Sequence, residues 1–127
     1  HNTDAEGRLI LADCLTLACE SKNDVIIDFA TLTGAARTAL GFDIPALFSN
    51  DETLARQIQD LSMRVGDPVW HLPLWSGYKS ELSSNHADLN NTGTSPAGAI
   101  TAALFLNEFV SAKTPWIHID HYAWEPY

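Results

Sequence analysis

The chain has 127 residues, with 16 Asp and Glu against 7 Lys and Arg, and a formal net charge of −9 when the histidines are neutral. This length fits a single domain. The hydrophobic fraction of 46% is too high for a disordered acidic segment. The few, scattered basic residues exclude nucleic acid as a default partner, because binding to phosphates needs clustered Lys and Arg.

The sequence contains no recognisable signal for a membrane or for secretion. The apolar run Ala97–Leu106 is interrupted by Gly98 and Thr101, and it is shorter than the ~20 residues that a membrane span needs. The N-terminus lacks a basic region followed by an apolar stretch, which a signal peptide would have. Cys14 and Cys19 lie about 140° apart around one predicted helix, which does not suit a disulfide. We therefore expect a reduced, cytoplasmic compartment and no membrane partner.

Apolar spacing predicts helices and strands that alternate along the chain. A helix at Gly7–Glu20 is followed by a buried strand at Val25–Ala30. After the loop Thr31–Gly34, the expected elements are a short helix at Ala35–Leu40, a strand at Ile44–Phe48, a helix at Asp51–Val65, an irregular stretch at Val69–Tyr78, a helical turn at Lys79–Leu82, a long loop at Ser83–Pro96, a buried helix at Ala97–Val110 and a strand at Trp116–Tyr122. We expect an α/β fold with three layers, in which a mostly parallel mixed sheet has helices on both faces.

The densest polar cluster is Asn2-Thr3-Asp4-Ala5-Glu6-Gly7-Arg8. If this segment is extended, Asp4, Glu6 and Arg8 project to one side, because side chains alternate along an extended chain. Two such carboxylates can share divalent ions, and the arginine supplies a fixed positive charge for an oxyanion. An EF-hand is excluded, because Gly7 falls at the fourth position of such a loop and not at the sixth. The same carboxylates could instead cap the following helix, and spacing alone leaves both interpretations open.

Six segments, in order along nearly the whole chain, resemble segments of the leucine (cytosol) aminopeptidase family. They are NTDAEGR followed by LILAD at the N-terminus, ATLTGA at Ala30–Ala35 followed by ALG at Ala39–Gly41, GDPVWHLPL at Gly66–Leu74, ADLNN at Ala87–Asn91, AGAITAA at Ala97–Ala103 and WIHID at Trp116–Asp120. The resemblance implies that residues 1–127 are part of a catalytic domain, truncated on its N-terminal side and at its C-terminus.

The resemblance also implies a metal site at the N-terminal segment. Asp4 would be a metal ligand, also through its backbone carbonyl, and Glu6 would bridge two divalent ions, Zn²⁺ or Mn²⁺. Arg8 would hold a bicarbonate that acts as general base toward metal-bound water. The family's further ligands and its catalytic lysine would lie upstream, since the first lysine of this chain is Lys22, in a predicted turn. The complete enzyme would be a hexamer that removes N-terminal residues from peptides, whereas residues 1–127 alone are predicted to be inactive.

For the substrate, the resemblance implies that Thr31 and Gly34 shape the pocket for the N-terminal side chain, and that Leu32 contributes backbone groups. This agrees with the physics of α/β sheets, which bind ligands at the carboxyl ends of their strands. Tyr122 stands where the family has a small alanine, so a reshaped or narrower pocket is predicted in place of a plain leucine preference.

Other chemistry finds less support in the sequence. The five histidines form no HExxH pattern, and His118 is predicted to be a packed strand residue and not a ligand. No nucleophile elbow or phosphate loop is present. The alternative to an enzyme is a non-catalytic scaffold or interaction module that keeps the fold with half of a metal site.

Overall fold

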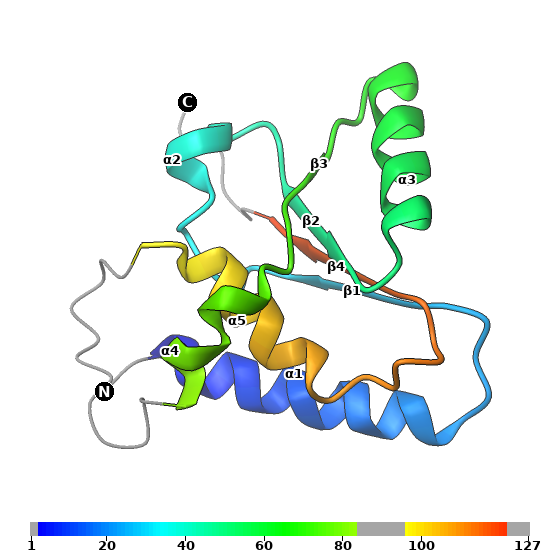
Figure 1. The fold of residues 1–127 in the computed structure, drawn as a ribbon. Coiled ribbons are helices and arrows are strands. Elements are labelled where there is room, and N and C mark those ends of the chain that lie inside the picture. Colours follow the sequence, from blue (N-terminus) through cyan, green and yellow to red (C-terminus); the bar gives the residue numbers. More distant parts are fainter. Residues whose placement is uncertain (1–2, 84–95, 122–127) are drawn as a thin grey trace.

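The computed structural model describes residues 3–83 and 96–121 (Figure 1). Helices and strands alternate along this part of the chain. The elements are α1 (Thr3–Glu20), β1 (Ile26–Ala30), α2 (Arg37–Leu40), β2 (Ala46–Ser49), α3 (Glu52–Val65), β3 (Trp70–His71), the 3-10 helix η1 (Ser76–Tyr78), α4 (Lys79–Ser83), α5 (Gly98–Asn107) and β4 (Trp116–Asp120).

The four strands form one mixed sheet in the order β1-β4-β2-β3. β1 runs parallel to β4, β2 runs antiparallel to β4, and β3 runs parallel to β2. In the β1–β4 pair, Asp28 lies opposite His118 and Ala30 lies opposite Asp120. The last strand of the described residues therefore lies beside the first, and their carboxyl ends meet at the same edge of the sheet.

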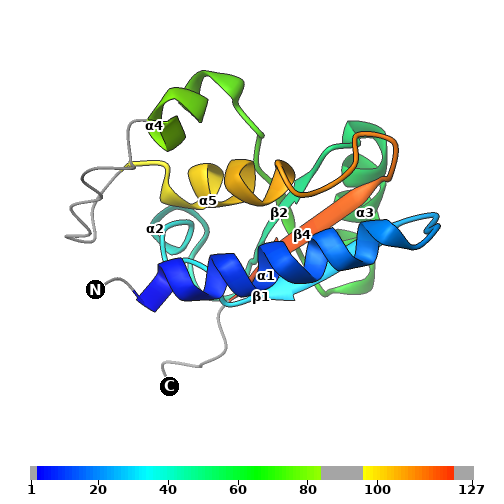
Figure 2. The same cartoon turned by 90° about the horizontal axis from the view of Figure 1, so that it is seen from below.

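Helices lie on both faces of this sheet, as Figure 2 shows from below. α1 and α5 cover one face, where Leu15 and Leu106 pack with Trp116 in one apolar cluster. α3 covers the other face, where Ala55 packs against Leu47 and Ile117. The predicted α/β class, with three layers and a mixed sheet, is confirmed. The predicted burial of the helix near the C-terminus is also confirmed, because the side chains of α5 at its core-facing positions are buried.

Several boundaries differ from the prediction. The first helix begins at Thr3 and not at Gly7, and β4 ends at Asp120 in place of Tyr122. The predicted loop Ser83–Pro96 falls mostly outside the described residues, as do the ADLNN segment and Tyr122. Within residues 3–83 and 96–121, no helix has the length and apolarity that crossing a membrane requires.

The stretch predicted to be irregular contains the short strand β3. It is attached to α3 by side-chain hydrogen bonds: Gln59 Oε1 accepts from the His71 backbone N–H at 2.7 Å, and Ser62 Oγ accepts from the Val69 N–H at 3.0 Å. A strand of two residues has no apolar periodicity of its own. Its position therefore follows from these polar contacts and could not be read from a hydrophobic pattern.

One face of β1 has no cover in the described part of the chain. Ile27 and Phe29 are 50% and 67% exposed, and they lie on the same side of the sheet as Ile117 and Ile119, their register partners in β4. α3 packs over β2 and β4 on that side. A hollow of about 370 Å³ beside β1 is lined by Asp24, Val25, Ile27, Asp51, Thr53, Leu54, Gln57, Ile58 and Pro115.

This uncovered apolar surface predicts that the 127-residue chain self-associates in solution. We expect sedimentation velocity to show a mass that rises with concentration, and Phe29→Ser to reduce that rise, because burial of apolar surface drives association. Val65→Ser is the matched control, since Val65 is equally apolar and 74% exposed at the end of α3. A monomer at all concentrations, or an equal effect of the control, contradicts the prediction.

Candidate functional site

The loop Thr31–Gly34 leaves the carboxyl end of β1, at the edge of the sheet where β4 also ends. Thr31 and Gly34 are exposed, whereas the Leu32 side chain is buried in the cluster with α1 and α5. The loop is thus anchored through its second residue, and its two ends face solvent. Open sheets place ligands at this kind of position, outside the carboxyl ends of the strands.

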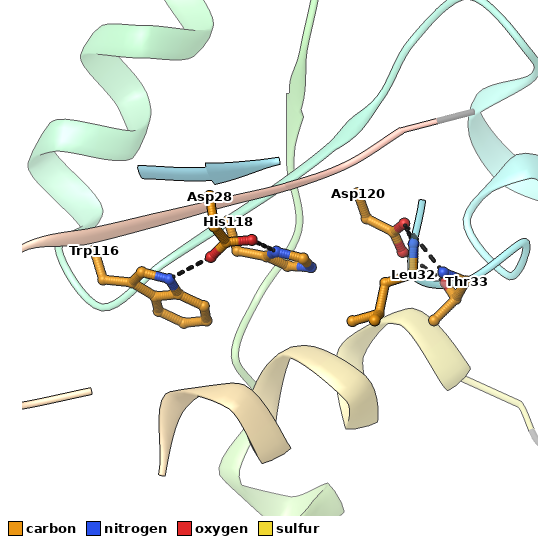
Figure 3. Close-up of polar contacts among 6 residues, drawn as sticks. All are labelled: Asp28, Leu32, Thr33, Trp116, His118 and Asp120. Atoms are coloured by element: carbon orange, nitrogen blue, oxygen red, sulfur yellow. Dashed lines mark hydrogen bonds and ion pairs between the residues drawn. The ribbon is translucent and has the colours of Figure 1, made fainter. Parts of the chain in front are cut away.

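The carboxylate of Asp120, the last residue of β4, holds this loop (Figure 3). Oδ1 accepts hydrogen bonds from the backbone N–H of Leu32 at 2.9 Å and of Thr33 at 3.1 Å. Oδ2 accepts from the Thr33 hydroxyl at 2.6 Å. Asp120 is 1% exposed, and a buried carboxylate requires such donors, because burial without them is costly.

A second buried carboxylate lies further back along the same two strands. Asp28 on β1 accepts from Trp116 Nε1 at 2.7 Å, and its other oxygen lies 2.5 Å from His118 Nδ1 (Figure 3). The His118 ring is 0% exposed and stacks with the ring of Phe48 and with that of Trp116. The prediction that His118 is a packed strand residue is confirmed. We call the four side chains of Asp28, Trp116, His118 and Asp120 the polar seam.

The N-terminal segment with Asp4, Glu6 and Arg8 lies in α1. The expected extended geometry, with the three residues on one side, is therefore not observed. In a helix, positions 4 and 8 share a face, whereas position 6 lies about 200° away from position 4 around the axis. The segment contains no proline, and Ala5, Glu6 and Arg8 favour a helix, so α1 extends back to Thr3.

This segment nevertheless lies beside the loop after β1. A Cβ built on Gly7 would come within 4.0 Å of Leu32 Cδ1, so the first turns of α1 approach the buried side chain of the loop. Figure 2 shows the same arrangement: α1 runs opposite to β1, and its N-terminal end lies at the end of the sheet from which the loop leaves. Glu6 is exposed there, and Arg8 is half-buried.

The described side chains contain no group of three metal-ligating residues. Among the side chains that the structure describes, which do not include that of Asp4, no three of His, Cys, Asp or Glu gather closely enough to hold an ion. Carboxylate oxygens are suitable donors for divalent ions. However, positions 4 and 6 of a helix do not face the same point.

Asp28, Thr33 and Asp120 have no role that was predicted from the sequence. Two signals in the sequence could have indicated them. Asp28 is a lone acid in an apolar strand, and residues 116, 118 and 120 alternate with period two, so that their side chains share one face of β4. The partners of these residues lie about 90 positions away in the sequence. They can be identified only from the order of the strands in the sheet, which the spacing of residues does not give.

Fold and site together thus define an α/β domain. Its candidate substrate loop, Thr31–Gly34, lies at the carboxyl end of a central strand pair. Residues 1–126 match the model of the cytosol aminopeptidase family, catalytic domain. The chain belongs to this family, and the resemblance found in the sequence is confirmed.

Similar proteins agree with this assignment. A probable cytosol aminopeptidase of Synechococcus sp. (strain RCC307) is 54% identical over 120 residues, which are 94% of this chain and 24% of that protein. The crystal structure of a cytosol aminopeptidase from Coxiella burnetii is 54% identical with a TM-score of 0.84, covering 98% of this chain and 27% of the other. The bottromycin maturation enzyme BotP in complex with Mn is 42% identical with a TM-score of 0.78, covering 91% of this chain and 26% of the other. The chain spans about a quarter of the length of the curated relatives it matches.

Removal of the Asp28 carboxylate is expected to destabilise the fold. Asp28→Ala would leave the Trp116 and His118 ring N–H groups buried without an acceptor, and each such group costs about 1–3 kcal/mol. We expect the free energy of unfolding, measured by urea denaturation, to fall by about 2 kcal/mol or more. Asp24→Ala, at an exposed position before β1, is the control and should change it by less than about 0.5 kcal/mol. Equal effects of the two variants would contradict a structural role of the Asp28 contacts.

Proposed function

We propose that the complete polypeptide containing these residues is a metal-dependent aminopeptidase, which releases N-terminal residues from peptides. The observation that carries this proposal is the meeting of two segments at one end of the sheet. The first turns of α1, with Glu6 and Arg8, lie beside the loop Thr31–Gly34. Membership of the cytosol aminopeptidase family supports the same activity.

In this proposal the site holds two divalent ions, Zn²⁺ or Mn²⁺, with Asp4 and Glu6 among their ligands. The similar enzyme BotP has a structure in complex with Mn, which supports manganese as one of the candidates. Such ions lower the pKa of bound water and polarise the scissile carbonyl. Joint binding by positions 4 and 6 requires the chain before Gly7 to leave the helical path, and the remaining ligands to come from outside these residues.

The residues of this chain then act on the substrate and on the anion. Arg8, whose guanidinium is permanently charged, holds a bicarbonate or an equivalent anion near the scissile bond. Thr31 and Gly34 flank the N-terminal side chain of the peptide. Leu32 offers its backbone carbonyl, because its N–H is already donated to Asp120. Tyr122, outside the described residues, narrows the same pocket.

The proposal also covers the compartment, the oligomeric state and the partners of the protein. The protein works in the cytoplasm on peptides, as a homohexamer, and binds neither nucleic acid nor membranes. The name "cytosol aminopeptidase" of its relatives supports the compartment, and the net charge of −9 argues against nucleic acid.

Glu6→Gln in the complete polypeptide tests the proposal. We expect kcat/KM for leucine p-nitroanilide to fall by at least about 100-fold, because a metal ligand loses its charge, while the melting temperature changes little. Glu20→Gln is the matched control, as it changes an exposed glutamate at the other end of α1. Chelation should abolish the activity of the unchanged protein, and Mn²⁺ or Zn²⁺ should restore it. Full activity of Glu6→Gln would refute the assignment of Glu6 as a metal ligand, whereas no activity of the unchanged complete polypeptide with either metal would favour a non-catalytic scaffold.

Residues 1–127 alone are predicted to have no peptidase activity. Metal affinity depends on the number and preorganisation of ligands, and the described residues offer no group of three. The highly purified chain should release no p-nitroaniline with Zn²⁺ or Mn²⁺ added. Activity that depends on the metal and disappears in Glu6→Gln of the same chain would overturn this prediction.

A further inference from the structure

We infer that Asp120 is a positioning residue for the substrate loop, which sets how tightly, and with what preference, the protein binds the N-terminal residue of a peptide. This inference deepens the proposed function and rests on it. Asp120 is not proposed to touch the substrate. It acts through the backbone of Leu32 and Thr33.

The contacts place Asp120 directly under the loop. One carboxylate oxygen accepts two consecutive backbone N–H groups, and the other accepts the Thr33 hydroxyl. The three donors come from residues that lie 87 and 88 positions away in the sequence. Hydrogen bonds to a charged group are about twice as strong as neutral ones, and a 1% exposed carboxylate is protected from competition by water.

These bonds determine which backbone groups the loop can present. The N–H groups of Leu32 and Thr33 point to the inside of the domain, toward β4. The Thr33 hydroxyl also lies 3.4 Å from the N–H of Ala35, which extends the contact to the far end of the loop. Thr31 and Gly34, the proposed walls of the side-chain pocket, therefore flank a segment with a fixed backbone. Loss of Asp120 would free both amides to turn outward and would change the distance between the two walls.

Asp28 serves as the comparison for Asp120, because it is also a buried carboxylate but has different partners. Both residues lie in the β1–β4 pair and on the same face. The partners of Asp28 are the ring nitrogens of Trp116 and His118, within the core. Asp120 instead accepts hydrogen bonds from Leu32 and Thr33 of the loop itself. A change at Asp28 should therefore affect stability, and a change at Asp120 should affect substrate binding as well.

Three variants of the complete polypeptide test the inference: Asp120→Asn, Thr33→Val and the control Asp28→Asn. Asparagine at position 120 can still accept from both amides but without charge, and valine at position 33 removes the hydroxyl while keeping the shape. We expect KM for aminoacyl p-nitroanilides to rise by about tenfold in Asp120→Asn and by less in Thr33→Val. The ratio of kcat/KM between leucine and alanine substrates should move toward one in both. Asp28→Asn should lower the melting temperature and leave KM unchanged.

A second measurement does not depend on activity. Amide hydrogen exchange followed by NMR or mass spectrometry should show faster exchange at Leu32 and Thr33 in Asp120→Asn, while these amides stay protected in Asp28→Asn. If the unchanged protein lacks peptidase activity but the exchange result holds, the proposed function fails and the structural part of the inference stands. Unchanged KM and substrate preference in an active Asp120→Asn protein, or an equal rise of KM in Asp28→Asn, would overturn the inference.

Discussion

The lone acid of β1 decides how the two central strands pair. The sequence Ile26–Ala30 is apolar on both of its faces apart from Asp28, so hydrophobicity alone does not say which face turns inward. Asp28 determines which face turns inward, because its carboxylate needs buried donors, and β4 offers the ring N–H groups of Trp116 and His118. On this face, the apolar core formed with α1 and α5 packs around the Asp28–His118 pair, which fixes the register of β1 and β4.

As a consequence, the two faces of the sheet differ in the side chains that cover them. On the inner face, the carboxylates of the polar seam accept from donors of the β1–β4 pair and the loop, and the apolar side chains of α1 and α5 pack with Trp116. On the opposite face, α3 covers β2 and β4, and β1 keeps Ile27 and Phe29 in solvent within the described residues. An apolar strand covered on one face is typical of a sheet that continues or is covered further. The chain also spans only about a quarter of its relatives' length.

Much of the architecture could be predicted from the periodicity of the sequence, but the pairing of the strands could not. The alternation of helices and strands, the buried helix α5 and the packed position of His118 could each be predicted from local pattern. The antiparallel direction of β2 and the two-residue β3 could not, because they depend on neighbours distant in the chain. Asp4, Glu6 and Arg8 were indicated by the polar cluster, and their roles came from the family resemblance. Thr31, Leu32 and Gly34 came from the resemblance alone. Asp120 came from the structure, since only strand order brings it under Leu32 and Thr33.

The register of the β1–β4 pair determines where the loop begins. A slip of β1 by one residue would move the start of Thr31–Gly34 by about 3.3 Å and turn every side chain of the strand to the other face. A misplacement of about 1 Å can already cost a large part of an enzyme's rate. Asp28 excludes the slip, because a shifted strand would place Ile27 or Phe29 opposite the ring nitrogens of Trp116 and His118. Asp120 then acts on a strand end whose register the whole β1–β4 pairing holds. A weakened Asp28 contact therefore lowers the stability of the pair, whereas only Asp120 contacts the loop itself.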